Sequence, residues 1–188
     1  IPKRELASFG TSDLAISEKQ TADWTVFAVW GYWKQHLILT HLHRERMDGP
    51  KMLALFESLY RSHNLQFLGI EDVAFQRLVI QDLKLKGLTI RPVRPQGDKV
   101  SRSVPAQVRM ENRELWLPDD RTLLDELIAF PSGRHDDMVD CVSQAAFLAD
   151  KYLKYVDEPK DTRTEEEKQA EEERLRQEHY NRLLMWGT

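Results

Sequence analysis

Residues 24–33 read Trp24-Thr-Val-Phe-Ala-Val-Trp-Gly-Tyr-Trp33, a run dominated by β-branched and aromatic side chains that favours a β-strand. A second run of this kind, Gln35-His-Leu-Ile-Leu-Thr-His-Leu-His43, follows after a short turn near Gly31 to Lys34. Two strands joined by so short a turn form a β-hairpin or meander in the simplest arrangement. The sequence therefore predicts a pair of neighbouring strands over residues 24–43.

Helices and strands alternate after this pair. Lys51 to His63 carries apolar residues at helical spacing, which predicts an amphipathic helix whose apolar face packs on the sheet. Phe67-Leu-Gly-Ile70 is a short apolar run typical of a buried strand. A second helix is expected from Phe75 to Lys86 with Gly87 as its C-cap, and a strand from Leu88 to Val93. We therefore expect an α/β fold.

The next part of the chain predicts a loop, a short strand and two further helices. Arg94 to Val104 is basic and rich in loop formers, so we expect a surface loop that enters a helix. Leu115 to Pro118 is expected to be extended, Asp120 to Phe130 carries a helical pattern, and His135 to Tyr155 is the last expected helix. These elements complete a domain that we place at residues 1–155.

The composition changes abruptly after this domain. Thr164 to Gln177 consists almost entirely of charged and polar helix formers, whereas the ending Tyr180-Asn-Arg-Leu-Leu-Met-Trp186 is apolar enough to dock on a surface. Residues 156–188 are therefore interpreted as a charged tail. It is either a solvated helix with an adhesive end or a disordered terminus.

Composition excludes several classes of protein. With 188 residues the chain is long enough for one domain with a core and too short for two substantial ones. The single cysteine, Cys141, excludes an internal disulfide and a thiolate-rich zinc site. No segment approaches the length of a membrane span. A net charge of −4 argues against a protein that coats nucleic acid, but not against an enzyme that gathers acidic metal ligands.

Acidic residues fall at the boundaries of the expected elements: Asp13, the pair Glu71 and Asp72, and Asp136 and Asp137 with Asp140. Strand ends in an α/β sheet meet at a crevice where ligands bind, so these carboxylates can converge. Clustered carboxylates repel one another unless a cation neutralises them, and oxygen ligands suit Mg²⁺ or Mn²⁺. Two such ions support phosphodiester hydrolysis.

Helical spacing places Asp140 on one face with both Asp136 and Asp137, and we prefer Glu71 to Asp72 because Asp72 alternates to the opposite side of the strand. Each acid also has an ordinary structural use, as a helix cap, a first-turn residue or a turn residue such as Asp23. The triple of aspartates favours the functional interpretation. His135 adjoins it and could support the site or shuttle a proton.

Basic residues Arg91, Arg94, Lys99 and Arg102 lie in and beside the expected loop and are candidates for DNA phosphate contacts. A solvated loop explains them equally well. His41 and His43 share a strand face, but no third ligand with recognisable spacing accompanies them, so we do not interpret them as a zinc site.

Four motifs together resemble the C-terminal nuclease domain of tailed-phage terminase large subunits. They are Asp13-Leu-Ala-Ile-Ser-Glu-Lys-Gln-Thr-Ala-Asp-Trp-Thr-Val26, Ile70-Glu-Asp-Val-Ala-Phe-Gln76, Gly97-Asp-Lys99 and His135-Asp-Asp-Met-Val-Asp140. Their order and spacing match over about residues 6 to 153. The resemblance implies a ribonuclease-H-like fold, with a central mixed β-sheet flanked by α-helices, and cleavage of concatemeric viral DNA with two divalent metal ions, Mg²⁺ or Mn²⁺.

Carried over by residue, the resemblance implies that Asp13, Glu71 and Asp137 are catalytic metal ligands and that Asp136 is adjacent and also ligating. The residues Asp23, Lys99 and Arg102 match further positions of the family, and we expect Asp72, His135 and Asp140 to be supporting residues. The sequence departs from the family at Leu14, where a small residue or proline is usual.

The resemblance also implies partners and a location. The partners are double-stranded DNA, the terminase small subunit, the ATPase domain of a full-length chain and the portal, with no membrane, in the cytoplasm of the host. No G-x-x-x-x-G-K-[ST] phosphate loop occurs in the sequence, so we expect a nuclease domain that does not hydrolyse ATP. The alternatives are another ribonuclease-H-like nuclease, such as a resolvase or transposase core, and a non-catalytic packaging interaction module.

Overall fold

The computed structural model describes residues 6–15, 24–73, 76–95 and 97–153, all of which belong to one compact unit, Ile1–Asp157. The charged tail at 156–188, its boundary and Asp23 lie outside the described residues, so the expectations for them stay predictions. No helix in the described part of the chain is both long enough and apolar enough to cross a membrane.

A six-stranded mixed sheet forms the centre of this unit, in the order β5-β4-β1-β2-β3-β6. Its strands are β1 (Ala7–Asp13), β2 (Thr25–Trp33), β3 (His36–Glu45), β4 (Leu68–Glu71), β5 (Ile90–Val93) and β6 (Leu115–Trp116). Strands β1, β2 and β3 form an antiparallel meander, β4 and β5 extend it in parallel beyond β1, and β6 pairs parallel to β3. The predicted pair of strands over 24–43 is confirmed.

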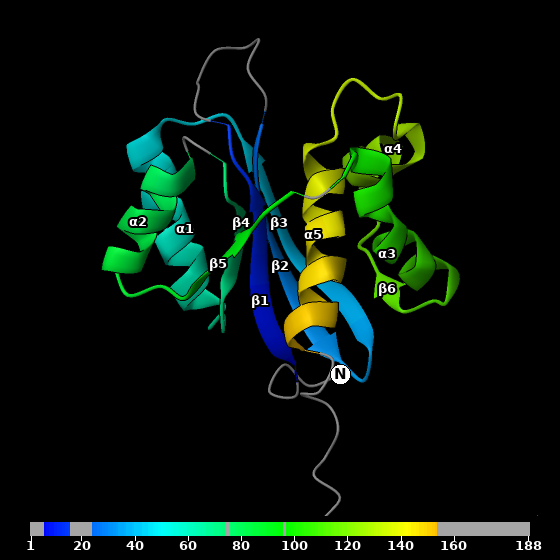
Figure 1. Cartoon of the computed structure of the whole chain (residues 1–188), viewed down its shortest axis with the longest axis horizontal. Helices are drawn as coiled ribbons and strands as arrows, with labels where there is room; N and C mark the ends of the chain where they lie inside the picture. Colours follow the sequence, from blue (N-terminus) through cyan, green and yellow to red (C-terminus); the bar gives the residue numbers. More distant parts are fainter. Residues whose placement is uncertain (1–5, 16–23, 74–75, 96, 154–188) are drawn as a thin grey trace, which may run out of the picture. The chain divides into compact units, whose positions relative to one another are not determined.

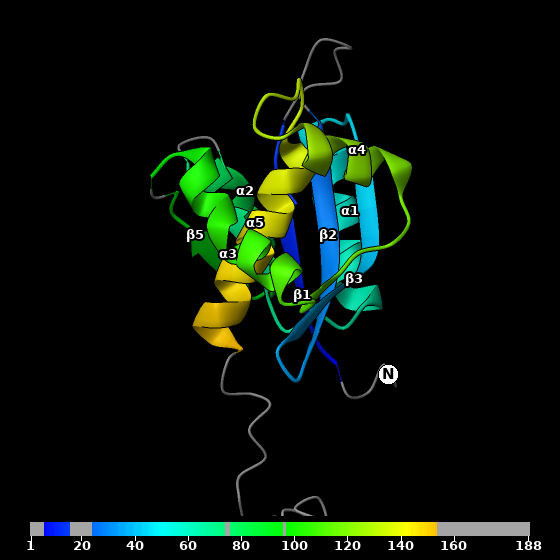
Figure 2. The ribbon, with the colours of Figure 1, turned by 90° about the vertical axis from the view of Figure 1, so that its right-hand side faces the viewer.

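Helices cover both faces of the sheet (Figure 1). One layer contains α1 (Gly49–Ser62) and α2 (Gln76–Leu85). On the other face α5 (Asp137–Tyr152) packs against β1 and β2, and α3 (Lys99–Glu111) and α4 (Arg121–Ala129) pack against α5. Figure 2 shows α5 lying along the sheet with α3 and α4 beside it. The α/β class with a central mixed sheet flanked by helices is confirmed.

The two layers explain why β2 lacks the polar and apolar alternation of a half-exposed strand. Val26, Ala28 and Trp30 belong to the core on the α5 side, whereas Phe27 and Val29 belong to the core on the α1 side. Successive side chains of a strand point to opposite faces, so a strand that is covered on both faces is apolar at every position.

Close contact between α5 and the sheet depends on small and polar residues. A Cβ atom at Gly69 of β4 would lie 2.3 Å from Cδ1 of Leu148. Thr11 of β1 donates its hydroxyl hydrogen to the carbonyl of Cys141 at 3.0 Å and accepts one from the indole of Trp30 at 2.9 Å. These contacts fix the position of α5 over β1 and β4.

One boundary prediction was wrong. The segment expected to be a loop from Arg94 to Val104 is already helical from Lys99, because the carboxylate of Asp98 accepts a hydrogen bond from the backbone N–H of Ser101 at 2.9 Å and caps α3. Lys99 and Arg102 therefore lie in the first turns of a helix. The last helix is also shorter than expected, since it begins at Asp137 and ends at Tyr152.

Candidate active site

Asp13 and Glu71 end two adjacent parallel strands. In the register of β1 and β4, Ser12 lies opposite Ile70, so the next residue of each strand is one of these acids. Thr11 and Gly69, two residues earlier, both face α5. Because side chains of a strand repeat every second residue, Asp13 and Glu71 face α5 as well. In Figure 1 these strand ends lie at the top of the sheet.

The N-terminus of α5 lies at the same end of the sheet. The amide Nε2 of Gln144, in its second turn, donates to the carbonyl of Ser12 at 3.4 Å. Asp137 begins the helix and is 6% exposed, and Asp140 follows one turn later. The fold therefore brings the acids from β1, β4 and α5 to the same end of the sheet, and their role as metal ligands stays a prediction.

The pKa of Asp13 reflects its burial and the nearby acids. Burial raises the pKa of Asp13 from its ordinary value of 3.8 to about 8, and the negative charges of Asp140, Asp137 and Glu71 contribute to this rise in that order. Burial also raises the pKa of Glu71, against the lowering effect of Arg102. A buried group of carboxylates of this kind is stabilised by a cation.

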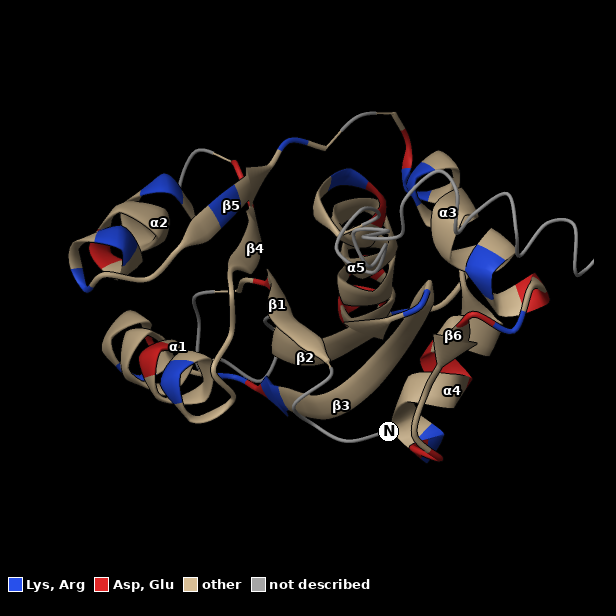
Figure 3. Cartoon of the chain, turned by 90° about the horizontal axis from the view of Figure 1, so that it is seen from below, with Lys and Arg blue, Asp and Glu red and all other residues tan. Residues whose placement is uncertain are grey.

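Two basic side chains from the start of α3 lie among the acids. Lys99 Nζ is 2.6 Å from Asp136 and 3.1 Å from Asp140, and Arg102 is 3.0 Å from Glu71 and 3.6 Å from Asp140. Burial alone would lower the pKa of Lys99, but hydrogen bonds to Asp136 and Asp140 raise it well above its usual value. Figure 3 shows the sheet largely uncharged, with charged positions on the helices and at strand ends.

The carboxylates are near one another without being converged. In the described ranges no three His, Cys, Asp or Glu side chains are arranged closely enough to hold a metal ion. The donor set itself suits a hard divalent cation, because it consists of carboxylate oxygens. The pKa of Asp13 is raised first by burial and then by nearby negative charges, which such a cation would neutralise. The residues thus fit a divalent cation by the chemistry of their oxygen donors, and binding requires their side chains to move closer together.

Two residues that the sequence did not point to hold the start of α5. Asp136 is the N-cap but its side chain makes no capping hydrogen bond. Instead the buried carboxylate of Glu126, on α4, accepts the backbone N–H groups of Met138 at 2.7 Å and Val139 at 3.3 Å. Arg44 of β3 lies 3.4 Å from Glu126 and 3.8 Å from Asp137. This arrangement orients the first turn of α5.

Several predicted site residues lie elsewhere or at the margin. Asp72 turns away from the cluster and pairs with Arg77 at 2.8 Å and Arg94 at 3.3 Å. Arg91 lies over the ring of Tyr152, at 4.8 Å from its centre, in the last turn of α5 and away from the acids. His135 Nδ1 is 4.0 Å from Asp137 Oδ2, beside the site. Of the four basic residues proposed to contact DNA, Lys99 and Arg102 are therefore the ones that touch the acidic cluster.

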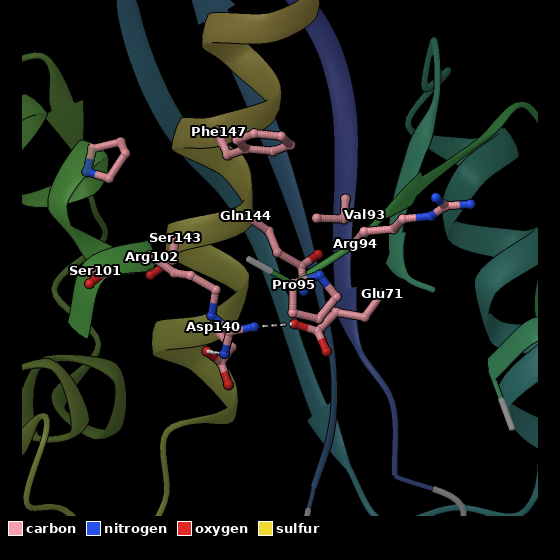
Figure 4. A pocket seen from close by; sticks show the side chains of 11 residues that line it. Glu71, Val93, Arg94, Pro95, Ser101, Arg102, Asp140, Ser143, Gln144 and Phe147 are labelled. Carbon is pink, nitrogen blue, oxygen red and sulfur yellow. Dashed lines mark hydrogen bonds and ion pairs between the residues drawn. The ribbon is translucent and has the colours of Figure 1, made fainter. Parts of the chain in front are cut away.

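A cavity of about 220 Å³ opens beside the acids (Figure 4). Glu71, Arg102 and Asp140 form its charged end, and its walls come from β5, α3 and α5. Nothing in the sequence indicated this cavity, since its lining residues come from separate elements that meet only through the packing of α3 on α5.

The mixed sheet, its strand order and the acids at its strand ends define the chain as an α/β domain of the ribonuclease-H-like class. The family model described as the terminase RNaseH-like domain matches residues 10–148. The chain belongs to this family, as the sequence motifs predicted.

Solved structures of terminase proteins share the fold. The large terminase nuclease from thermophilic phage G20c, crystallised with magnesium, superposes with a TM-score of 0.63 at 19% identity, covering 76% of this chain and 82% of that one. The same nuclease has also been crystallised with zinc and with cobalt. The human cytomegalovirus terminase nuclease domain, Mn soaked and inhibitor bound, gives a TM-score of 0.55 at 15% identity, with coverages of 78% and 85%.

A longer protein also matches. The large terminase from another thermophilic bacteriophage gives a TM-score of 0.56 at 14% identity, and the match covers 81% of this chain but 41% of that one. No curated protein sequence was found to match the chain.

Proposed function

We propose that this domain is the endonuclease of a phage terminase large subunit, which hydrolyses phosphodiester bonds of concatemeric double-stranded DNA with two divalent metal ions during genome packaging. The observation that carries the proposal is the meeting of Asp13, Glu71 and the acids of α5 at one end of the sheet, in a chain of the terminase RNaseH-like family. Three structures of one similar nuclease, with bound magnesium, zinc or cobalt, support a divalent cation.

In this proposal Asp13, Glu71 and Asp137 hold the metal ions, with Asp136 beside them. Divalent ions bound to these carboxylates would supply an activated water and stabilise the oxygen that leaves phosphorus. Asp140 lies close enough to Asp13 to raise the pKa of Asp13. Asp140 therefore either supports the helix or is itself a metal ligand. Lys99 and Arg102 are already among the carboxylates, so a phosphate that enters the site comes within their reach.

The remaining residues orient this machinery. Glu126 fixes the first turn of α5 through the N–H groups of Met138 and Val139, and Arg44 bridges Glu126 and Asp137. Charge-assisted hydrogen bonds of this kind fix the orientation of a side chain that binds a metal, here Asp137. We propose that His135, whose Nδ1 lies 4.0 Å from Oδ2 of Asp137, supports the site from outside the ligands or acts as a proton shuttle.

The packaging role follows from the family. We propose that the domain works beside an ATPase domain, with the terminase small subunit and the portal as partners, in the host cytoplasm. The match to the longer large terminase of a thermophilic bacteriophage, of which 41% is covered, supports the presence of a further domain beside the nuclease.

The test is cleavage of supercoiled plasmid with Mg²⁺ or Mn²⁺, compared with EDTA. We expect nicking by the natural chain in either metal, loss of nicking in EDTA and in Asp13→Asn, and full nicking in Asp82→Asn. Asp82 is an exposed aspartate on α2 and serves as the matched control. Equal nicking by Asp13→Asn and Asp82→Asn, or nicking that survives EDTA, would contradict the proposal.

A further inference from the structure

The cavity beside the acids has flat apolar walls at the end away from the charges. Val93 and Pro95 line it from the end of β5, Pro105 from α3 and Phe147 from α5. Phe147 is 43% exposed although it is large and aromatic, and Figure 4 shows its ring at the opposite end of the cavity from Asp140. Exposed rings and proline faces of this kind are surfaces on which planar groups stack.

Polar groups without partners complete the cavity. The side chain of Gln144 is buried, with the residue 6% exposed, and extends from α5 toward Pro95 (Figure 4). Its Nε2 donates to Ser12, which leaves Oε1 as an acceptor with no hydrogen-bond partner in the described part of the chain. Arg102 Nε is likewise a buried donor without a partner there. Buried polar atoms usually have partners, so these two atoms are available to bond a molecule that enters the cavity.

The chemistry of the cavity selects one kind of ligand. An acceptor from Gln144 and a donor from Arg102 match the edge of a nucleobase, which carries both donors and acceptors. A phosphate inside the cavity is disfavoured, because Glu71 and Asp140 repel it unless metal ions neutralise these carboxylates. The volume of about 220 Å³ is below the roughly 300–1,000 Å³ of pockets that hold whole drug-sized ligands, so it suits a single planar ring system.

We propose that this cavity receives one nucleobase of the substrate strand, unstacked from the duplex, while the neighbouring phosphate lies at the acids. This inference rests on the proposed nuclease function. Glu71 and Asp140 line the cavity and also belong to the acidic cluster, so a base in the cavity and its own phosphate at the acids are adjacent parts of one nucleotide. Taking a base out of the stack costs least where it is already unpaired. The domain therefore favours DNA with an unpaired base next to the cut.

The test compares three labelled duplexes that differ at one position: fully paired, with one bulged adenine, and with one bulged abasic residue. Binding is measured by fluorescence anisotropy in Ca²⁺, a divalent cation that neutralises the acids, and a denaturing gel run afterwards checks that the DNA is intact. We expect about tenfold tighter binding of the adenine bulge than of the abasic bulge, the effect of stacking one base on an aromatic side chain. Cleavage of the same duplexes in Mn²⁺ should concentrate beside the adenine bulge.

Two variants test whether the cavity causes this difference in affinity. In Phe147→Ala and Gln144→Met, the affinities for the adenine bulge and the abasic bulge should differ by no more than about twofold. The first variant removes the stacking surface and the second removes the acceptor. Leu85→Ala and Gln81→Met make matched changes at exposed positions of α2 and should leave the ratio unchanged. Phe147 is partly exposed, so its replacement keeps the test valid if Gln144→Met fails to fold.

Equal affinity for adenine and abasic bulges, or a ratio that persists in Phe147→Ala, would overturn the inference. The outcome is separable from the proposed function, which is judged by plasmid nicking of the natural chain. Metal-dependent nicking without a preference for the adenine bulge leaves the nuclease standing and removes the nucleobase site.

Discussion

The layer of α1 and α2 meets the sheet through apolar side chains such as Met52, Phe56 and Val79, whereas α5 brings Asp137 and Gln144 into buried positions against it. The charges of the first layer stay at its surface, where Glu57 pairs with Arg61 and Lys86. The first layer is therefore a scaffold, whereas the second holds polar groups whose burial costs stability, as is typical of functional sites.

The largest contrast is expected for the acids of α5. Asp137→Asn should reduce plasmid nicking by about a hundredfold or more while the domain stays folded, because the carboxylate that holds a cation is lost and its shape is kept. Asp140→Asn should reduce plasmid nicking less than Asp137→Asn does. Nicking rates and melting temperatures of both variants, measured together, give the order. Full activity in Asp137→Asn with loss in Asp140→Asn would reverse the assignment.

A second contrast sets Glu126 against Glu57. Glu126→Ala removes the acceptor for two N–H groups of α5 and the partner of Arg44, and should lower the free energy of unfolding by about 1–3 kcal/mol. Nicking should fall too, because Asp137 loses its orientation. Glu57→Ala, in the other layer, should change both quantities much less. Urea unfolding provides the first measurement, and equal effects of the two variants would remove the distinction between the layers.

A smaller contrast concerns how closely the helices approach the sheet. Gly69→Ala places a methyl group against Leu148 of α5 and should cost about 1–3 kcal/mol through overpacking. Gly49→Ala, at the start of α1, has no atom within 4 Å of the added group and should be nearly neutral. Thermal unfolding of both variants tests this. A neutral Gly69→Ala would mean that α5 has room to move.

Much of this organisation was predictable, because it depends on local patterns. The apolar run at 24–33, the helical spacing after Lys51 and the glycine at position 87 all reflect preferences of single segments. The structure confirms the elements that they predicted, and Gly87 has the positive φ expected of a helix C-cap. Asp13, Glu71 and Asp137 were recognisable because each stands at the end of an element. Their roles as ligands stay predictions.

The parts that the sequence did not reveal arise from packing between distant segments. The contact of Glu126 with the start of α5, the bridge from Arg44 and the cavity beside Gln144 join residues that are separated along the chain. The error at Lys99 has a local cause instead, since Gly97 and Asp98 look like loop formers while Asp98 in fact caps α3. Polar residues at helix starts are easily mistaken for loops for this reason.

The pH dependence of stability follows from Asp13. Its pKa is about 8 in the folded chain against an ordinary value of 3.8, so the folded state binds a proton that the unfolded state releases over this range. The free energy of unfolding therefore falls as pH rises from about 4 to about 8, as far as this group is concerned. Asp13→Asn should remove that part of the decline.

The α5 side of the sheet carries a cluster of carboxylates, and we propose that a divalent cation stabilises it. Melting temperatures at pH 8 of the natural chain and of Asp13→Asn, each in EDTA and in Mn²⁺, test this proposal. In EDTA, Asp13→Asn should melt about 4–8 °C higher, which corresponds to roughly 2 kcal/mol. Mn²⁺ should raise the melting temperature of the natural chain and leave that of Asp13→Asn almost unchanged. An equal response of both proteins to Mn²⁺, or a lower melting temperature for Asp13→Asn in EDTA, would contradict the claim.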